Sequence, residues 1–482
     1  MKKRILSMLF ALLLLCTACT STKDSTDTTA PIDTTSGLEN TNAPETTAKP
    51  VLIPENFGGY VFNILTSYPE NETNSSLFAD ERNSSQVNDK IALRNEKIEK
   101  EYNVKLVETI SEDPMSDLTS SELSSSPEYD ALILSAYHMA GLVSSALVLD
   151  MTELDKIDIT APYFDAAAVR DLSLGTKLYT VSGDLLNCSY GATSVVICDN
   201  ALVEHYNFKS AFGKSLDQIV ANGEWTIDVM KAAAEDAKYI HANSDEGMLF
   251  GLAADIGDAY SLSVGVFGTI FEKDKNDLPL LNVTNDGFTK LLKKISEFSL
   301  FEDESLASFG NCSKSIDGST LFAVSSLEEA AIRIKSGQCI SILPMPKADK
   351  DQQSYACRVS LDHSMLAGIP ASAKDSSISA AILSALFEGS TETTKAEYFS
   401  AFENGCTHKL FSDLSVILES RKYDLGDLFS WGDFDTLIKE KINSEDLEKE
   451  FSSDAKIREQ AAEKAMDIVL KRLLGDDYKE EK

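Results

Sequence analysis

The sequence is poor in basic residues. Lys and Arg together number 44 of 482 residues, against 77 Asp and Glu, so the formal net charge at pH 7 is −33. Proteins that bind nucleic acid depend on clustered basic side chains that neutralise phosphates. The charge balance therefore excludes nucleic acid as the main partner. It indicates a soluble, acidic surface and says little about the fold.

Long apolar runs are also missing, since no segment approaches the roughly 20 residues that a membrane-spanning helix needs. The first residues carry a shorter apolar segment, residues 5–15, directly after the basic residues Lys2, Lys3 and Arg4. A basic start followed by a short apolar segment is typical of a secretory signal peptide. The sequence therefore predicts that residues 1–18 are a leader and that the chain is exported.

Cysteine is scarce and follows no metal-binding pattern. Beyond the leader and Cys19 the chain has Cys188, Cys198, Cys312, Cys339, Cys357 and Cys406. Their spacings match no zinc or haem motif. An even number permits disulfides in an oxidising compartment, although a chain of this length can fold without them. We expect buried thiols, and the sequence leaves their redox state open.

The leader ends in the sequence Cys16-Thr-Ala-Cys19, with two small residues before the second cysteine. This ending resembles the lipobox of bacterial lipoproteins, in which the cysteine is lipidated and becomes the first residue. Cys16 stands where such boxes usually carry Leu, and bulky Leu15 makes Cys16 the poorer acceptor. A redox or zinc half-site shares the Cys-x-x-Cys spacing, but a cleavable leader suits neither. The resemblance implies palmitate or a related acyl chain on Cys19, with the protein at the extracellular face of the cell membrane.

Residues 19–52 are rich in Thr, Ser and Pro and contain almost no large apolar residues. Such a segment cannot bury enough apolar surface to offset the entropy of ordering it. We therefore expect a flexible tether. The tether leaves a body of about 430 residues, long enough for two large domains.

Strand-like and helix-like segments alternate along the body. Residues 60–65 and 104–110 have the pattern of buried strands, and residues 87–102 between them place apolar side chains at helical spacing. Further strands are predicted at 129–134, 177–181, 192–198, 339–343 and 361–369, with helices at 200–206, 226–238 and 376–387, and at 454–474 with Ile457, Ala461, Ala465 and Ile468 on its apolar face. This alternation favours an α/β fold with mainly parallel pairing, in two lobes.

Seven short segments, distributed in sequence order along most of the body, together carry a family resemblance. They are RNEKIEKEYNV (94–104), YDALIL (129–134), LGTKLY (174–179), GEWTI (223–227), ISILPMPK (340–347), AGIP (367–370) and SRKYDLG (420–426). Together they resemble the extracellular solute-binding proteins of family 1, the carbohydrate-type receptors of ABC importers. They resemble in particular the lipoprotein members common in clostridia-like bacteria.

The resemblance implies a periplasmic-binding-protein-like fold: two α/β lobes, joined by crossing hinge strands, with a ligand cleft between them. Carried over, lobe 1 comprises residues 53–183 and 366–404, and lobe 2 comprises residues 184–365 and 405–482. The lobes would close on a sugar or oligosaccharide, and ABC permease subunits would recognise the closed form. The resemblance implies a monomer without a cofactor. The same fold could instead serve a non-sugar solute, such as a peptide or polyamine, or act as a sensor.

Several polar and aromatic residues are candidates for the cleft, because open α/β sheets bind ligands beyond the carboxyl ends of their strands. The candidates are Ser67 and Tyr68 after the first strand, Ser135 and Tyr137 after the third, Asp184 and Tyr190 beside the first crossing, Asp255, Asp258 and Tyr260 in a polar stretch of lobe 2, and Trp431 in a Gly-containing loop. Relatives often carry tryptophans near residues 162–165, whereas this chain has only Trp225 and Trp431. We expect Trp225 in the core, and for Trp431 both ligand stacking and packing are open.

Enzyme and metal signatures are weak. The five histidines are scattered, and the aspartates near residue 275 lack the glycine of a calcium loop. The chain has no Gly-x-Ser-x-Gly elbow and no phosphate-binding loop. Ser453 and Lys456 share the spacing of penicillin-interacting enzymes but lack the partner motifs, so Ser453 is interpreted as a helix cap. An extracellular glycoside hydrolase, which needs two carboxylates, stays as the alternative of another class; we expect no catalysis.

Overall fold

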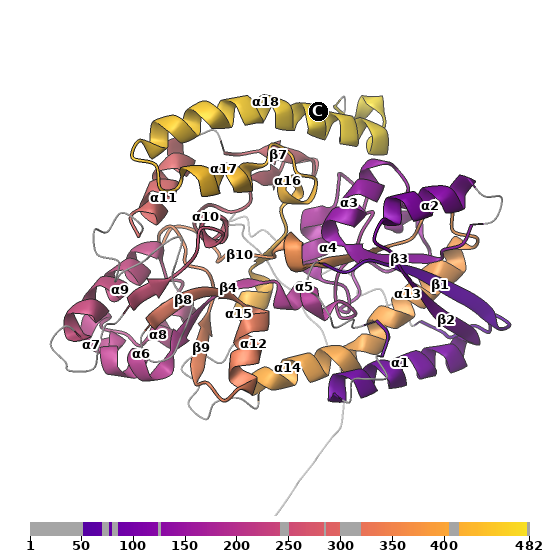
Figure 1. Ribbon diagram of the computed structural model, residues 1–482, viewed down its shortest axis with the longest axis horizontal. Helices are drawn as coiled ribbons and strands as arrows, with labels where there is room; N and C mark the ends of the chain where they lie inside the picture. Colours follow the sequence, from indigo (N-terminus) through magenta and orange to yellow (C-terminus); the bar gives the residue numbers. More distant parts are fainter. Residues whose placement is uncertain are drawn as a thin grey trace, which may run out of the picture. The chain divides into compact units, whose positions relative to one another are not determined.

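The computed structural model describes residues 52–69, 77–79, 85–123, 127–241, 250–283, 286–298, 320–403 and 414–479 (Figure 1). The predicted leader, the predicted lipidation site Cys19 and nearly all of the predicted tether lie outside these residues. Within the described ranges, no helix is both long enough and apolar enough to cross a membrane.

One four-stranded sheet has the order β11-β3-β1-β2. It consists of β1 (Tyr60–Thr66), β2 (Val104–Ile110), β3 (Ala131–Ser135) and β11 (Met365–Gly368). β1 pairs in parallel with β2 and with β3, and β11 adds an antiparallel edge. Helices α1 (Gln86–Tyr102) and α3 (Ala136–Ser144) pack on it, and α13 (Ser376–Ser390) packs against α1. We call the part of the fold built on this sheet lobe 1.

A second four-stranded sheet has the order β5-β8-β4-β9. It consists of β4 (Ser194–Asp199), β5 (Phe250–Ala253), β8 (Thr320–Ser326) and β9 (Ile340–Leu343). β4 runs antiparallel to both of its neighbours. Helices α6 (Asn200–Tyr206), α9 (Ile227–His241) and α12 (Leu327–Lys335) pack on this sheet. We call the part built on it lobe 2.

Two small sheets contain the remaining strands of the described residues. β10 (Cys357–Arg358) pairs with β12 (Arg421–Lys422), and β6 (Phe271–Lys273) forms a hairpin with β7 (Pro279–Leu281). The other helices are α2 (Pro114–Leu123), α4 (Ala166–Leu172), α5 (Asn187–Gly191), α7 (Phe208–Phe212), α8 (Leu216–Ala221), α10 (Asp258–Phe267), α11 (Asp286–Ser296), α14 (Ala396–Glu403), α15 (Ser415–Glu419), α16 (Leu425–Leu428), α17 (Phe434–Lys441) and α18 (Leu447–Leu474).

The chain passes from the sheet of lobe 1 to the sheet of lobe 2 between α3 and β4, and three residues of this stretch contact Arg421, at the start of β12. Its guanidinium donates to Asp165 Oδ2 at 2.5 Å, to the Ser189 carbonyl at 2.6 Å and to Thr193 Oγ1 at 3.1 Å. The side chain is 1% exposed, and the Tyr190 ring lies 4.6 Å from the guanidinium carbon. A fully buried guanidinium needs such partners, because an unpaired buried charge is costly. Arg421 therefore fixes the segments that join the lobes.

Most predicted strands and helices are present. The strands expected at 60–65, 104–110, 129–134, 192–198 and 339–343 correspond to β1, β2, β3, β4 and β9. Residues 177–181 form no regular strand, and only Val181 is bridged to Ala367. The expectation of mainly parallel pairing is wrong, because β4 pairs antiparallel on both sides and β11 is antiparallel as well.

The C-terminal helix α18 buries a different face from the one predicted. Ile457 and Ile468, expected to face inward, are 70% and 50% exposed. The buried side chains include Phe451, Ala455 and Ala462, because α18 packs on α11 and α17. The rings of Phe451 and Phe288 lie 5.4 Å apart. Figure 1 shows α18 running along α17 toward α3.

The last turn of α18 reaches lobe 1. Arg472 donates to the Ser144 carbonyl at 2.7 Å, and the Tyr179 hydroxyl donates to the Leu473 carbonyl at 3.0 Å. Ser144 ends α3, so a helix that packs mainly on α11 and α17 is also tied to lobe 1.

Cysteines 198 and 357 are buried free thiols, and Cys188 is half-buried and not part of a disulfide. Burial raises the pKa of the Cys357 thiol to about 12, so it stays protonated. Cys339 is disulfide-bonded, so the expectation of thiols alone is wrong at this position. Cys312 and Cys406 lie outside the described residues.

Candidate ligand-binding site

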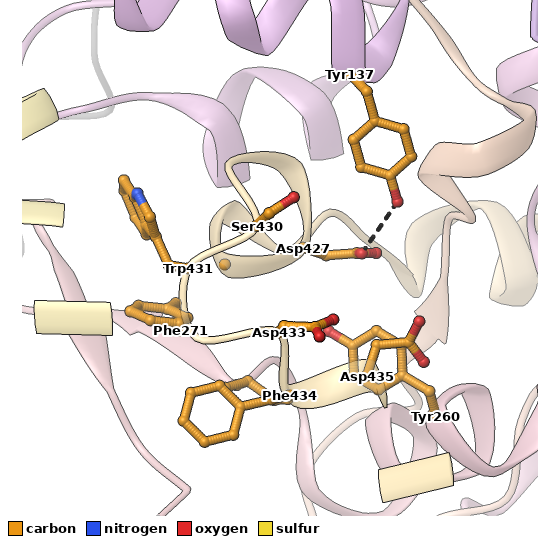
Figure 2. A pocket seen from close by; sticks show the side chains of 11 residues that line it. Tyr137, Tyr260, Phe271, Asp427, Ser430, Trp431, Asp433, Phe434 and Asp435 are labelled. Carbon is orange, nitrogen blue, oxygen red and sulfur yellow. Dashed lines mark hydrogen bonds between the residues drawn. The ribbon is translucent and has the colours of Figure 1, made fainter. Parts of the chain in front are cut away.

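A cavity of about 80 Å³ lies where α3 of lobe 1 faces α10, β6 and the segment 426–435. It is lined by Tyr137, Tyr260, Ile270, Phe271, Gly426, Asp427, Ser430, Trp431, Asp433, Phe434 and Asp435. Figure 2 shows the Tyr137 ring directed at Asp427, with Asp433, Asp435 and Tyr260 gathered close to one another. The lining is aromatic and acidic.

Tyr137 is the lobe 1 residue in the lining. It follows β3 directly, at the second position of α3, so the end of a buried strand fixes its backbone. Its side chain is 38% exposed, and its hydroxyl donates to Asp427 Oδ1 at 3.3 Å. Burial and nearby carboxylates raise the pKa of Tyr137, so the phenol remains a hydrogen-bond donor.

Asp427 is held from behind by Arg358 of β10. Arg358 Nη2 and Asp427 Oδ2 are 2.7 Å apart, and their side chains are only 9% and 7% exposed. The guanidinium carbon also lies 4.5 Å from the centre of the Tyr260 ring. The ion pair and the ring contact position Asp427 with its second oxygen toward Tyr137.

Asp424, which caps α16, lies beneath the cavity. It accepts hydrogen bonds from the Ile270 amide at 2.6 Å, the Gly426 amide at 2.8 Å and the Tyr260 hydroxyl at 3.1 Å. Burial, followed by the charge of Asp427, raises the pKa of Asp424 to about 6. This carboxylate thus joins α10, β6 and α16 into one wall.

The aromatic wall is tightly packed around Trp431. The indole stacks on Phe429 with ring centroids 5.0 Å apart and contacts Phe271 at 5.3 Å. It is only 2% exposed. A Cβ on Gly426 would come within 2.2 Å of the Phe271 ring, so only glycine allows this close approach. The geometry shows the packing role of Trp431; a stacking contact with ligand stays a prediction.

Two further aspartates come from the loop after Trp431 and the start of α17. Asp433 pairs with Arg458 at 3.2 Å, and Asp435 Oδ2 pairs with Lys439 at 2.7 Å. Asp435 Oδ1 is buried and accepts no hydrogen bond. Burial raises the pKa of Asp435, because its charged form is poorly solvated there.

Three of the residues predicted from the sequence, Tyr137, Tyr260 and Trp431, line this cavity together. Ser67, Tyr68 and Ser135 gather at the carboxyl ends of β1 and β3 but are not in its lining. Ser67 Oγ lies 2.9 Å from His138 Nδ1, and the Ser135 amide donates to Ser67 Oγ at 3.2 Å. The Tyr68 hydroxyl donates to Glu108. A binding role for each of these residues stays a prediction.

The structure places Asp184 and Tyr190 in the interior beside Arg421. The Tyr190 hydroxyl donates to Asp184 at 2.8 Å, and Thr391 and Lys395 bind the same carboxylate at 2.7 and 2.8 Å. In this structure these contacts hold the two residues in a buried network and away from the cavity.

Asp255 closes the turn before α10. Its Oδ1 accepts from the Gly257 amide at 2.8 Å, and its own amide donates to Asp258 Oδ2 at 2.8 Å. Neither aspartate is in the lining. Asp274 likewise closes the β6–β7 turn through the amides of Asn276 and Leu278. Within the described part of the chain, no group of three or more His, Cys, Asp or Glu side chains is placed to hold a metal.

Sequence reasoning missed Asp427, Ser430, Asp433 and Asp435. The signal was present, because all four lie within four residues of Trp431 in a segment that contains Gly426 and Gly432. A cluster of polar residues and glycines around an isolated tryptophan is typical of a binding loop. With 77 acidic residues in the chain, however, no single aspartate stands out.

No protein-family model matches the sequence, and no curated protein does either. Solved structures do match at low identity. The sugar-binding protein MalE from Xanthomonas citri is 12% identical, with a TM-score of 0.55 over 86% of this chain and 98% of that one. A family 1 extracellular solute-binding protein from Bifidobacterium longum subsp. infantis is 13% identical, with a TM-score of 0.53 over 84% and 100%.

The galacto-N-biose/lacto-N-biose I-binding protein of a Bifidobacterium longum ABC transporter, solved with lacto-N-biose, is 14% identical. Its TM-score is 0.52 over 86% of this chain and 98% of that one. All three are named as binding proteins, and none is named as an enzyme. The body of this protein thus has the fold of the family 1 extracellular solute-binding proteins, which confirms the fold that its sequence segments imply.

Proposed function

We propose that this protein is the solute receptor of an ABC importer and that its solute is a sugar or oligosaccharide. The observation that carries the proposal is the cavity, because both lobes contribute to it. Tyr137 of lobe 1 faces Asp427, Ser430 and Asp433 from the other side. A ligand that contacts both walls favours the arrangement of lobes in which both contacts form. An importer could then distinguish the loaded receptor from the empty one.

The lining also supports a carbohydrate. Aromatic rings pack against the C–H faces of a sugar ring, and carboxylate and hydroxyl oxygens accept hydrogen bonds from its hydroxyl groups. No basic side chain lies in the lining formed by the described residues, so the cavity offers little to an anionic solute. Two of the solved structures that share the fold are named for the sugars or disaccharides that they bind.

We further propose that Cys19 carries a lipid and that the tether holds the body outside the cell membrane. The basic leader, the small residues before Cys19 and the polar segment after it support this proposal. Replacing Cys19 with Ala should move the protein from the membrane fraction to the medium. If the Cys19→Ala protein stayed with the membranes, the anchoring proposal would be wrong.

Ligand binding can be tested by thermal unfolding of the protein in the presence of a panel of mono- and oligosaccharides. A ligand at 100 times its Kd should stabilise the fold by about 2.7 kcal/mol, and this should raise Tm by a few degrees. Asp433→Ala, which changes an exposed residue of the lining, should remove this stabilisation. Glu463→Gln, on the exposed side of α18, is the matched control and should retain it.

Other outcomes point to the alternatives. If only peptides stabilised the protein, the fold assignment would stand, but the solute would be a peptide and not a sugar. Turnover of a chromogenic glycoside would favour the hydrolase alternative and contradict the receptor proposal, whereas stoichiometric, saturable binding without turnover would count against the hydrolase.

A further inference from the structure

We propose that the ligand group held in this cavity is a protonated amine, as in an amino sugar. The inference rests on the proposed receptor function, because it takes this cavity as the place where the solute binds. It specifies the charge of the ligand, a property that the fold alone does not determine.

The first argument is hydrogen-bond complementarity. The charged side chains in the lining are Asp427, Asp433 and Asp435, and the described lining contains no Lys, Arg, His, Asn or Gln. Ionised carboxylates only accept hydrogen bonds, whereas an ammonium group only donates them. A sugar hydroxyl both donates and accepts, so it would find few side-chain donors here. An ammonium group offers three donors and requires no donor from the lining.

The second argument is the charge balance around the cavity. Four carboxylates stand in or directly beneath it: Asp424, Asp427, Asp433 and Asp435. Three cations pair with them, namely Arg358 with Asp427 at 2.7 Å, Lys439 with Asp435 at 2.7 Å and Arg458 with Asp433 at 3.2 Å. Arg458 is also shared with Glu440 at 3.5 Å, so five carboxylates face three cations. A positively charged ligand would reduce this excess of negative charge.

The third argument concerns Asp435. Its Oδ1 is buried and accepts no hydrogen bond, while Oδ2 is occupied by Lys439. An unsatisfied buried acceptor is costly, and a charged donor recovers more of that cost than a neutral one. The raised pKa of Asp435 agrees with this reading, because it reflects burial that its existing partners do not offset.

The aromatic walls and the size of the cavity fit an ammonium group. Tyr137, Tyr260, Phe271, Trp431 and Phe434 line it, and aromatic rings attract cations. The Tyr260 ring already has the Arg358 guanidinium 4.5 Å from its centre. A cavity of about 80 Å³ has room for several water molecules. That room suits an amino group with its neighbouring carbons, and the remainder of the ligand would lie outside.

The experiment is calorimetric titration of the full-length protein, in detergent at near-neutral pH, with matched pairs of sugars. The pairs are glucose and glucosamine, galactose and galactosamine, and cellobiose and its diamino counterpart; spermidine serves as an amine without a sugar. We expect the amino member of a pair to bind at least about tenfold more tightly, which is about 1.4 kcal/mol. Asp435→Asn and Asp433→Asn should each reduce that preference, and Glu463→Gln should not.

Each outcome decides the inference. Equal or tighter binding of a neutral member would overturn the inference and leave the receptor proposal standing. Binding of spermidine but of no sugar would support the amine and overturn the carbohydrate class. Binding of neither sugars nor amines would overturn both. An amine preference that persists in both aspartate variants, with unchanged thermal stability, would show that the amine binds elsewhere and would overturn the assignment.

Discussion

The hydroxyl of Tyr137 donates to Asp427 Oδ1 at 3.3 Å, so a residue of lobe 1 contacts the cavity wall formed by α16. Asp427 is in turn paired with Arg358 at 2.7 Å. The three residues form a chain of polar contacts from α3 through α16 to β10. The hydrogen bond from Tyr137 to Asp427 is long and half exposed, whereas the ion pair between Asp427 and Arg358 is short and buried.

The two parts of Tyr137 should have separable roles. Tyr137→Phe removes only the long hydrogen bond, so we expect stability to change by less than about 1 kcal/mol and ligand affinity to change little. Tyr137→Ala also removes one wall of the cavity, and we expect affinity to fall about tenfold or more. Titration of both variants with the best ligand checks this. Equal affinities of the two variants would contradict a role for the ring.

Arg421 should be essential for stability. Arg421→Met leaves Asp165 buried without its guanidinium partner, and breaking a buried pair in this way costs about 3–5 kcal/mol. Arg421→Lys keeps the charge but cannot reach Asp165, Ser189 and Thr193 together, so its loss should be intermediate. Urea unfolding measures both losses. A loss below about 1 kcal/mol for Arg421→Met would show that the network contributes little.

Asp217, in the first turn of α8, should lower stability at neutral pH. Burial raises its pKa to about 6, and its Oδ1 accepts no hydrogen bond. Because the folded protein holds this proton more tightly than the unfolded chain, stability falls as pH rises from about 4 to 6. Asp217→Asn lacks this loss. Allowing for partial exposure, we expect it to be about 1 kcal/mol more stable than the wild type above pH 6.

The difference between these two proteins should vanish below about pH 3, where the aspartate is protonated in both the folded and the unfolded state. Unfolding in urea at several pH values measures it. A stability difference that does not depend on pH would contradict ionisation as the cause.

Tryptophan fluorescence should report on the cavity through one residue. Of the two tryptophans, Trp431 lines the cavity, whereas Trp225 is fully buried in lobe 2 and donates to the Pro344 carbonyl at 3.0 Å. Ligand binding should therefore change the emission of Trp431 only. Trp431→Phe should abolish the change, and Trp225→Phe should retain it. Loss of the signal in Trp225→Phe alone would place the ligand away from this cavity.

Local sequence patterns predicted the elements better than the contacts between them. The strand at residues 60–65 and the helix before residue 103 have clear apolar periodicity, and both are present with nearly the expected bounds. The sequence of helix α18 has two apolar faces. The face with Phe451 and Ala462 is buried because α11 and α17 pack there, and no local pattern distinguishes it from the face with Ile457.

The same limit applies to the site. The sequence predicts Tyr137 as a candidate because it follows a strand end, and Tyr260 because it lies in a polar stretch of lobe 2; both line the cavity. The sequence predicts Asp184 for the cleft because it lies beside the first crossing. In the structure its carboxylate binds Thr391 and Lys395, which lie more than 200 positions further along the chain. Pairings at such separations depend on tertiary structure and leave no signal in the neighbouring sequence.

The positions of the partners of Arg421 in the sequence also determine which part of the fold can form first during synthesis. Asp165, Ser189 and Thr193 precede Arg421 by 256, 232 and 228 positions. A growing chain can form most of the sheet of lobe 1 early, but the junction of the lobes must wait until residue 421 has emerged. A fragment that stops earlier would bury Asp165 without a guanidinium. Such a fragment should open readily and be degraded by proteases, so incomplete copies of the protein would be removed.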